Sequence, residues 1–267
     1  MGAPQSLVVS WPASMLDDPR GHYPIELLQL ALRHAGERYR IEPARGDLSQ
    51  SRSLVNLELG RGLDVAWTFS TRERERRLLP VRIPIDRGLL GWRLLLVRED
   101  SPAAAGVDEP ALRALRLAQG HDWPDLAVLR HNGLRVAGGS SYTGLFEMLR
   151  LGRIDAFPRS VSEIYAELQA DRAHGLTVLP GWTLQYPAPA YFFVNRERPE
   201  LAAEIEAGLR SALADGSWTE VFQRHFGPAL TRAQLSQRRA LVLENPDLHP
   251  STPLADPSLW YRPGTDA

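Results

Sequence analysis

A polar stretch after an apolar run carries residue types that can bind carboxylates. Residues 63–69, LDVAWTF, predict a short buried strand, and Thr68 and Ser70 near its end offer hydroxyl donors. The next segment holds Arg72, Arg74, Arg76 and Arg77. A guanidinium presents a planar pair of N–H donors that matches a carboxylate. Alternatively, the hydroxyls are ordinary strand-end residues. Glu73 and Glu75 between the arginines are also typical of a solvated charged turn.

Two loops in the second half of the chain could bind an anionic group. Gly120 and His121 lie between a predicted strand and a predicted helix, and Ser140 and Ser141 follow a glycine pair in the same arrangement. Backbone N–H groups at a helix start attract negative charge, and glycine lets a ligand approach the backbone closely. The alternatives are an exposed loop histidine and a serine that only caps its helix.

Three further side chains are candidates for the same chemistry. Trp11 ends a predicted strand and could stack on a planar ligand, although a packing role explains it equally well. Arg159 and Glu163 follow a predicted strand at residues 155–157 and offer a cation and a carboxylate. The spacing Ser160-x-x-Glu163 also fits a capping box, which satisfies two backbone N–H groups without a ligand, and we favour this reading for Glu163.

Composition excludes several classes of function. There are 31 Lys and Arg against 32 Asp and Glu, whereas general nucleic-acid binders usually carry a clear basic excess. The absence of cysteine excludes disulfides, thiolate metal sites and cysteine nucleophiles. The sequence shows no serine-hydrolase elbow, zinc-protease motif or convincing acid–base pair, and we predict no cofactor and no metal. No apolar run approaches the roughly 20 residues that span a membrane, and the N-terminus lacks the pattern of a signal peptide.

Strands and helices alternate along the chain, which predicts α/β architecture with parallel sheets. The expected strands are residues 7–11, 39–43, 63–69, 92–97, 115–118, 134–136, 155–157, 176–179 and 191–194. The expected helices are residues 24–36, 49–59, 124–132, 142–151, 161–174, 199–213 and 217–226. The polar segment 99–110 and the proline-flanked segment 186–189 predict two crossings between lobes. One lobe then comprises residues 1–98 and 189–267, and the other comprises residues 99–188.

Several segments together resemble a known family. They are residues 62–97, the stretch Leu149–Phe157 with its Gly-Arg-Ile-Asp-Ala core, and the late helix from Pro199 with the Asp-Gly turn before Trp218. In order and spacing they are similar to the type II periplasmic solute-binding proteins, the extracellular family 3 that includes the polar amino-acid binders. The resemblance covers residues 7–226, and the tail beyond it suggests a less characterised branch. It implies two lobes, each a mostly parallel sheet flanked by helices, joined by a two-strand hinge.

The resemblance also implies roles for particular residues. In the family, a turn of the Thr-x-x-Arg type follows the aspartate-containing strand. By resemblance, an arginine around Arg74 and Arg76 would bind the ligand carboxylate. Because the spacing from Asp64 differs from the family's, a neighbour in the 72–77 segment is the alternative, and we select Arg74. We expect Arg74 to face Ser140 and Ser141 across the cleft between lobes. Amino-acid binders carry an acidic residue near position 160 that holds the ligand's ammonium. Here that position is Ser160, with Arg159 beside it, which favours a more anionic ligand.

The resemblance implies a periplasmic monomer that closes on a small anionic or zwitterionic, amino-acid-like solute. Its partners would be that ligand and a membrane component of an ABC transporter, or a receptor, with no nucleic acid. A signal peptide would have been removed from such a chain. The alternatives are an enzyme on the same fold, of the dehydratase or peptidoglycan-cleaving type, and a ligand-sensing module.

Overall fold

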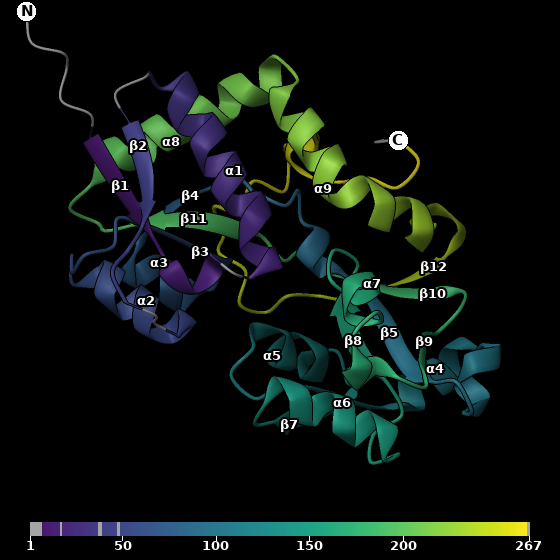
Figure 1. Ribbon diagram of the computed structural model, residues 1–267. Helices are drawn as coiled ribbons and strands as arrows, with labels where there is room; N and C mark the ends of the chain where they lie inside the picture. The colour runs from purple at the N-terminus through teal and green to yellow at the C-terminus, as the bar shows by residue number, and fades with distance from the viewer. Residues whose placement is uncertain (1–6, 17, 37–38, 47–48, 266–267) are drawn as a thin grey trace, which may run out of the picture. The chain divides into compact units, whose positions relative to one another are not determined.

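The structure is a computed structural model that describes residues 7–16, 18–36, 39–46 and 49–265. The chain has mixed α/β architecture and divides into two compact units (Figure 1). Unit 1 comprises Met1–Arg87, Pro189–Pro228 and His249–Trp260. Unit 2 comprises Gly88–Ala188, Ala229–Leu248 and Tyr261–Ala267. Each unit is therefore built from separated stretches of sequence.

Unit 1 contains two sets of paired strands with helices around them. Its elements are β1 (Leu7–Trp11), a 3₁₀ turn η1 (Ala13–Met15), α1 (Pro19–His34), β2 (Tyr39–Pro43), α2 (Gln50–Glu58), β3 (Val65–Phe69), α3 (Arg72–Arg77), β4 (Leu79–Val81), β11 (Ala190–Val194), α8 (Pro199–Ala214) and most of α9 (Ser217–Ala233). β1 pairs parallel with β2, and β11 lies between β3 and β4, antiparallel to both. The late strand β11 thus joins the two ends of the polar stretch around α3.

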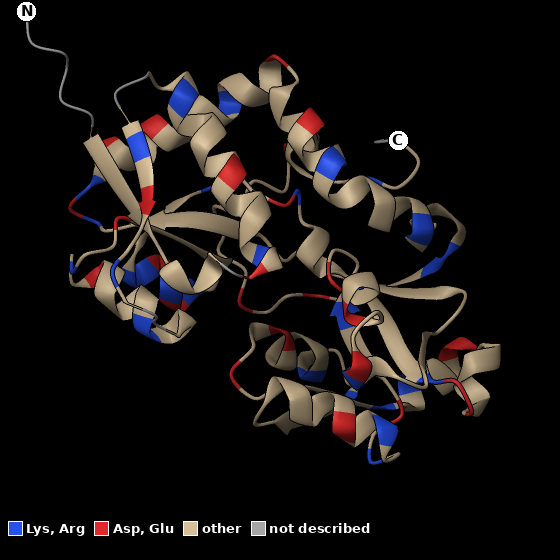
Figure 2. Ribbon diagram, in the orientation of Figure 1, with Lys and Arg blue, Asp and Glu red and all other residues tan. Residues whose placement is uncertain are grey.

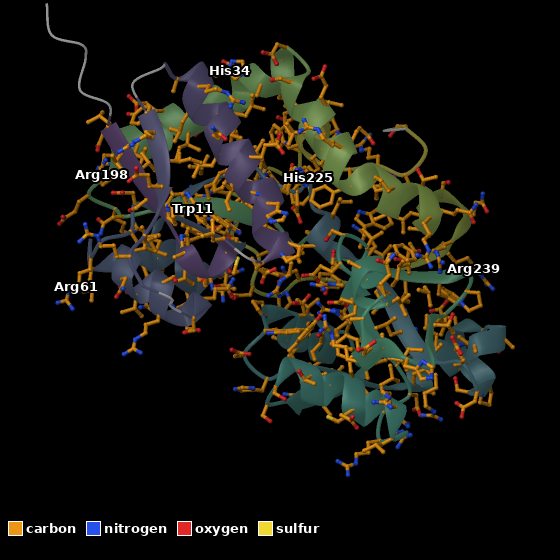
Figure 3. All side chains as sticks on the ribbon, in the orientation of Figure 1. Trp11, His34, Arg61, Arg198, His225 and Arg239 are labelled. Atoms are coloured by element: carbon orange, nitrogen blue, oxygen red, sulfur yellow. The ribbon has the colours of Figure 1, made fainter. Side chains whose placement is uncertain are left out.

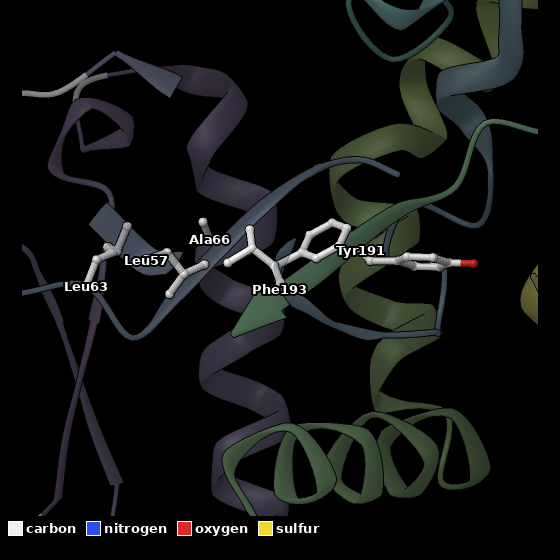
Figure 4. Close-up of a cluster of buried hydrophobic side chains, with 6 residues drawn as sticks. Leu57, Leu63, Ala66, Tyr191 and Phe193 are labelled. Atoms are coloured by element: carbon white, nitrogen blue, oxygen red, sulfur yellow. The ribbon is translucent and has the colours of Figure 1, made fainter. Parts of the chain in front are cut away.

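The core of unit 1 is built from the strands and from two long helices. Leu57, Leu63, Ala66, Leu78, Tyr191 and Phe193 form one buried cluster, drawn in Figure 4. α1 and α8 pack so closely that a Cβ on Gly208 would lie 1.9 Å from the carbonyl oxygen of Ala31, and only glycine avoids that clash. Trp218 donates to the Tyr23 hydroxyl at 2.9 Å, which in turn donates to the Ile85 carbonyl, so α9 is tied to α1.

Unit 2 is organised around one central strand. Its elements are η2 (Leu89–Gly91), β5 (Trp92–Arg98), η3 (Pro102–Ala105), α4 (Glu109–Ala114), β6 (Arg116–Gly120), α5 (Pro124–His131), β7 (Arg135–Gly139), α6 (Tyr142–Arg150), β8 (Phe157–Ser160), α7 (Ile164–Glu167), η4 (Asp171–Ala173), β9 (Leu176–Val178), β10 (Trp182–Gln185), η5 (Leu235–Gln237) and β12 (Arg239–Val242). The sheet order is β12-β10-β5-β8, and β9 also pairs with β5. β6 and β7 form a separate parallel pair.

Several predicted elements differ from the observed ones. The first helix begins at Pro19 rather than Pro24, because Asp18 accepts a hydrogen bond from the Arg20 N–H and caps it. The strand predicted at residues 155–157 lies at Phe157–Ser160, which places Arg159 inside the strand. The helix predicted at residues 161–174 is reduced to α7 and η4.

The chain changes units at more positions than the two crossings that the sequence predicts. β5 belongs to unit 2 because it pairs with β8, β9 and β10, so the chain divides between Arg87 and Gly88, before this strand. A second division falls between Ala188 and Pro189. The sequence places residues 189–267 together in one lobe, but β12 pairs parallel with β10, which assigns residues 229–248 to unit 2.

A fully buried charged network holds three parts of unit 2 together. The Arg93 guanidinium on β5 donates to the Asp125 carboxylate on α5 and, through Nε, to the Tyr186 hydroxyl at 3.1 Å. Tyr186 also donates to Asp125. All three side chains are buried, so each charge depends on its partner for the interactions that water would otherwise supply. The network therefore fixes α5 to β5, which follows the boundary after Arg87, and to the segment around Tyr186, which precedes the boundary after Ala188.

We expect Asp125→Ala to destabilise the protein by about 3–5 kcal/mol, because it leaves the Arg93 charge buried without a partner. Glu109→Ala is the matched control, since it breaks the exposed Glu109–Arg113 pair of the same unit and should cost about 0.5 kcal/mol. Urea denaturation measures both. An Asp125→Ala variant as stable as the Glu109→Ala variant would contradict the importance of this network.

Candidate functional site

The end of β3 and the start of α3 bring Thr68 and Arg74 into contact. Thr71 caps α3 by accepting from the Arg74 backbone N–H at 3.1 Å. The cap turns the chain so that Arg74 Nη1 reaches back to the strand end. It donates to Thr68 Oγ1 at 2.9 Å and to the Phe69 carbonyl at 2.7 Å. Arg74 is half-buried, so the protein itself positions this guanidinium.

Ser70 serves a buried carboxylate of the same helix. Glu75 is 3 % exposed, and its Oε1 accepts from the Ser70 hydroxyl at 2.6 Å. Its Oε2 accepts from Arg82 Nη2 at 2.6 Å, and His249 Nδ1 lies 3.7 Å from the same oxygen. Glu75 and Arg82 are therefore structural members of the site that the sequence did not single out. The alternation of arginine and glutamate in α3 gave no sign that one glutamate turns inward.

The remaining arginines of α3 differ in their surroundings. Arg77 donates to Glu58 and lies 3.6 Å from Glu73, which makes it part of a surface charge network. Arg72 and Arg76 are exposed. Figure 2 shows basic and acidic residues mixed along this helix. The segment is thus a short helix with one side on the protein rather than a charged turn, and Arg74 is the arginine whose side chain contacts the end of β3.

Trp11 is a packing residue in this structure. It is 4 % exposed, and its ring centroid lies 6.4 Å from that of Trp67 on β3. Among the described residues, its indole Nε1 has no hydrogen-bond partner. Figure 3 shows Trp11 among the side chains of unit 1, whereas Arg61 points outward from it. An indole buried in this way has no free face for a ligand, which favours the packing alternative.

Four candidates of unit 2 meet at one edge of the β6–β7 pair. Because these strands are parallel and in register, Gly120 stands opposite Gly139, and His121 and Ser140 follow at the same edge. His121 Nδ1 lies 3.1 Å from the Gly139 carbonyl; since a carbonyl only accepts, this contact places the proton on Nδ1. Ser141 caps α6 by accepting from the Gly144 N–H at 3.1 Å.

Trp123 explains why position 120 is glycine. A Cβ at Gly120 would lie 2.6 Å from the Trp123 ring, so the indole can pack over the strand end only if residue 120 has no side chain. His121, Ser140 and Ser141 are exposed. This edge therefore presents serine hydroxyls and the N-terminal end of a helix to solvent, and these are donors suited to an anionic group. The His121 imidazole, with its proton on Nδ1, offers an acceptor at Nε2 instead.

Arg159 is engaged by the protein instead of being presented at a loop. It is 2 % exposed on β8, and its Nε donates to both oxygens of Glu167, at 3.0 and 2.8 Å. Its Nη2 donates to Glu167 Oε1 at 2.5 Å and to Glu163 Oε2 at 2.9 Å. Glu163 makes no side-chain cap for α7, so the predicted capping box is wrong. The carboxylate turns to Arg159 because the adjacent charge is the stronger hydrogen-bond donor.

Aromatic rings surround the same guanidinium. Its carbon lies 5.1 Å from the centroids of Trp123 and Phe157 and 5.4 Å from that of Tyr142. The Tyr142 hydroxyl donates to Glu167 at 2.6 Å. Cation–π attraction and paired carboxylates together compensate the loss of hydration. We call this group, residues 123, 142, 157, 159, 163 and 167, the Arg159 cage.

The cage shifts the ionisation of its members. Burial raises the pKa of the Glu167 carboxyl, but the hydrogen bonds and the charge of Arg159 outweigh burial and hold the pKa below its usual range. Burial, together with the adjacent Glu167 charge, raises the pKa of Tyr142 to about 12. At neutral pH the cage therefore holds an ionised glutamate and a protonated tyrosine donor.

One surface cluster resembles a catalytic triad in composition but not in geometry. His34 Nε2 lies 3.3 Å from Asp215 and 3.4 Å from the Ser217 hydroxyl. That hydroxyl donates directly to Asp215 at 2.7 Å. In a working triad the acid binds the imidazole nitrogen opposite the serine, so this arrangement does not activate a nucleophile. Figure 3 labels His34 on unit 1.

The structure has hollows away from the candidate residues. One in unit 1, of about 410 Å³, is lined by residues that include Ser10, Ser53 and Asp64. Another in unit 2, of about 440 Å³, lies beside Trp182 and Arg239. Within residues 7–16, 18–36, 39–46 and 49–265, no group of His, Asp and Glu side chains is arranged to hold a metal ion. No helix of the described chain is both long and apolar enough to cross a bilayer.

Comparison with solved structures identifies the fold. No protein-family model matches the chain, and no curated protein matches it in sequence. The periplasmic VFT2 domain of BvgS from Bordetella pertussis is 18% identical, with a TM-score of 0.61 over 82% of this chain and 93% of that domain. A periplasmic His/Glu/Gln/Arg/opine family-binding protein from Silicibacter pomeroyi, in complex with lysine, is 14% identical, with a TM-score of 0.60 over 83% of this chain and 97% of that one.

A histidine kinase sensor domain with similarity to periplasmic binding proteins is 19% identical, with a TM-score of 0.58 over 83% of this chain and 96% of that one. At such identities the likeness shows the fold and not the ligand. The predicted fold class, a two-unit α/β protein of the periplasmic-binding-protein type, is confirmed. The prediction that each unit holds a mostly parallel sheet is wrong, because β5 and β11 run antiparallel to the strands that they pair with, and only β1–β2, β6–β7 and β10–β12 are parallel among the named strand pairs of the described residues.

The Arg159 cage should make stability depend on acid pH. Because the pKa of Glu167 is lowered on folding, its contribution is fully present above the unfolded-state pKa of about 4.3 and is lost as the pH falls through the lower folded-state value. We expect Glu167→Gln to cost about 3–5 kcal/mol at pH 7. The gap between wild type and variant should then shrink below about pH 4 in denaturant titrations.

Glu163→Gln is the matched control for the Glu167 variant. The Glu163 side chain is part-exposed and contacts the same guanidinium, so its loss should cost no more than about 1 kcal/mol at pH 7. A gap between wild type and Glu167→Gln that stays constant from pH 7 to pH 3 would refute the pKa assignment.

Proposed function

We propose that the protein binds a small, anionic or zwitterionic, amino-acid-like solute and that its two units close on it. The observation that carries the proposal is the arrangement at the end of β3, where Thr68 and the Phe69 carbonyl hold the Arg74 guanidinium in place. A guanidinium positioned at a strand end is ready to bind a carboxylate with little further loss of side-chain entropy. The fold, shared with proteins described as binding amino acids, supports this use.

The second contact would come from the edge of the β6–β7 pair. Ser140, Ser141 and the N-terminal end of α6 offer donors, and donors suit a negatively charged group. His121, whose Nδ1–H is directed to the Gly139 carbonyl, offers an acceptor at Nε2 to a hydroxyl or ammonium of a zwitterionic ligand. Glu163 is the residue that could supply the acid for a ligand ammonium, and its carboxylate is paired with Arg159 at 2.9 Å. The ligand class that fits this charge balance is therefore an acid or a zwitterion rather than a cation. We propose that Arg74 faces Ser140 and Ser141 when the ligand is bound.

The cellular setting belongs to the same proposal. A periplasmic monomer would deliver its ligand to an ABC transporter component or to a receptor, without any nucleic acid. Ligand sensing is the second candidate, because a histidine kinase sensor domain shares the fold. Catalysis is disfavoured because the Ser217, His34 and Asp215 geometry does not activate a nucleophile. The candidate loops likewise show no acid–base pair.

We expect Arg74→Ala to weaken ligand binding at least tenfold, because losing a charge-assisted pair costs about 2–5 kcal/mol. A thermal-shift screen of amino acids, dicarboxylates and small peptides identifies the ligand, since a bound ligand raises apparent stability by mass action. Calorimetry then measures its affinity. Arg76→Ala, on the exposed side of the same helix, is the control and should bind as wild type does.

Equal affinity of the Arg74→Ala and wild-type proteins would remove α3 from the site. A screen in which none of the three ligand classes raises the melting temperature would sink the proposed function itself.

Binding should occur without turnover. A ligand found in the screen, incubated with the protein and analysed by mass spectrometry, is expected to be recovered unchanged. Product in stoichiometric excess over the protein would show that the chain is an enzyme on this fold.

A further inference from the structure

The C-terminal tail, residues 239–261, runs beside both segments at which the central part of the chain changes units. Those changes fall between Arg87 and Gly88 and between Ala188 and Pro189. The tail itself changes units between residues 248 and 249 and again between residues 260 and 261. Its contacts explain how it is held, and each of them lies within a single unit. The tail is drawn in yellow-green to yellow in Figure 1.

The first part of the tail is fixed to the segment before Pro189. β12 pairs with β10, and the Leu243 N–H continues the pairing by donating to the Gln185 carbonyl at 2.8 Å. Asn245 Nδ2 then donates to the Pro187 carbonyl at 2.8 Å. This contact is made two residues before the chain enters unit 1. The tail thus adds hydrogen bonds to a segment whose Tyr186 N–H already donates to the Gly91 carbonyl at 3.1 Å.

Asn132 secures the same part of the tail to α5. Its Nδ2 donates to the Glu244 carbonyl at 2.8 Å, and its Oδ1 accepts from the Glu244 N–H at 2.9 Å. Two reciprocal bonds to the backbone of one residue, Glu244, fix the register of the tail next to Asn245. The contact with Pro187 therefore rests on a positioned backbone and not on a free loop.

The last part of the tail lies at the other boundary. Arg87 Nη2 donates to the Ser258 carbonyl at 3.5 Å, and Leu259 is buried in unit 1. After the chain returns to unit 2, the Tyr261 ring meets Trp92 edge-on, with centroids 6.5 Å apart. Tail residues therefore contact the chain on both sides of the Arg87–Gly88 division.

We propose that the tail is a clamp on the hinge and restricts how far the two units move relative to each other. The proposal rests on the proposed closure of the units, for which segments 87–92 and 185–189 are the hinge. A movement at these segments must deform a tail bonded to both of them, so the clamp biases the open–closed equilibrium and thereby sets apparent ligand affinity. The tail would then tune ligand affinity from outside the ligand site.

Distance measurements on the full chain test the clamp without a ligand. The chain has no cysteine, so spin labels can be attached at Ala207→Cys on α8 and Ala127→Cys on α5, both exposed positions. Double electron–electron resonance then gives the distribution of distances between the units. Adding Asn245→Ala and Tyr261→Ala should raise the fraction outside the main peak about fivefold, the factor that corresponds to one net hydrogen bond.

Asn195→Ala is the matched control. Its side-chain amide also bridges backbone carbonyls, those of Leu57 and Glu58, but entirely within unit 1, so it should leave the distribution unchanged. Thermal melting verifies that each labelled variant is folded. If the double variant does not fold, cleavage of the tail is used in its place. A protease recognition site is introduced at the exposed Leu254–Ala255 bond, and the protease cuts the tail in the folded protein.

Superimposable distributions before and after the tail is loosened or cut would overturn the proposal. Because no ligand enters this experiment, its failure leaves the Arg74 experiments untouched. A failed ligand screen likewise does not alter the distances.

Discussion

Burying a guanidinium is the constraint on which most of unit 2 depends. Arg93 and Arg159 both lie on strands of the central sheet, and both are nearly inaccessible to water. Each requires a carboxylate in contact, which Asp125 supplies to one, while Glu163 and Glu167 supply it to the other. α5 and α7 are consequently held to the sheet by charge as well as by apolar packing. Removing one partner of such a pair is costly because the other charge is then buried without compensation.

This constraint also shapes the surface available to a ligand. Arg159 draws Glu163 towards the interior, and the hydroxyl donors left at the strand edge of unit 2 are those of Ser140 and Ser141. In unit 1, the Ser70 hydroxyl donates to Glu75, whereas the Thr68 hydroxyl accepts from Arg74. The binding preference we propose therefore follows from which polar groups the protein uses for its own folding and which it leaves exposed.

The sequence predicted the architecture well and the internal partners poorly. Alternating apolar segments place most strands and helices, because burial of one face imposes a period that is visible in the residues. Boundaries were less accurate where a cap decides them, as Asp18 does for α1. Partners distant in sequence leave no such trace. Nothing local shows that Glu75 turns towards Arg82, or that Glu163 and Glu167 turn towards Arg159, and the Ser160-x-x-Glu163 spacing was read as a cap for this reason. The pairing of β12 with β10 likewise leaves no local signal, because it joins residues that are far apart in the chain.

The Arg159 cage has the composition of a binding site for a guanidinium compound. Flat aromatic faces around a planar cation, closed at one end by two carboxylates, form the kind of receptor that a protein builds for a guanidinium compound. Here the bound guanidinium is the side chain of Arg159 itself. Shortening the side chain at position 159 would leave a cavity with the shape of a guanidinium group. Trp123, Tyr142 and Phe157 would line this cavity, and the two carboxylates would leave it negatively charged. Unit 2 thus contains, around one position of β8, a set of groups that would suit a guanidinium compound and that its own Arg159 occupies.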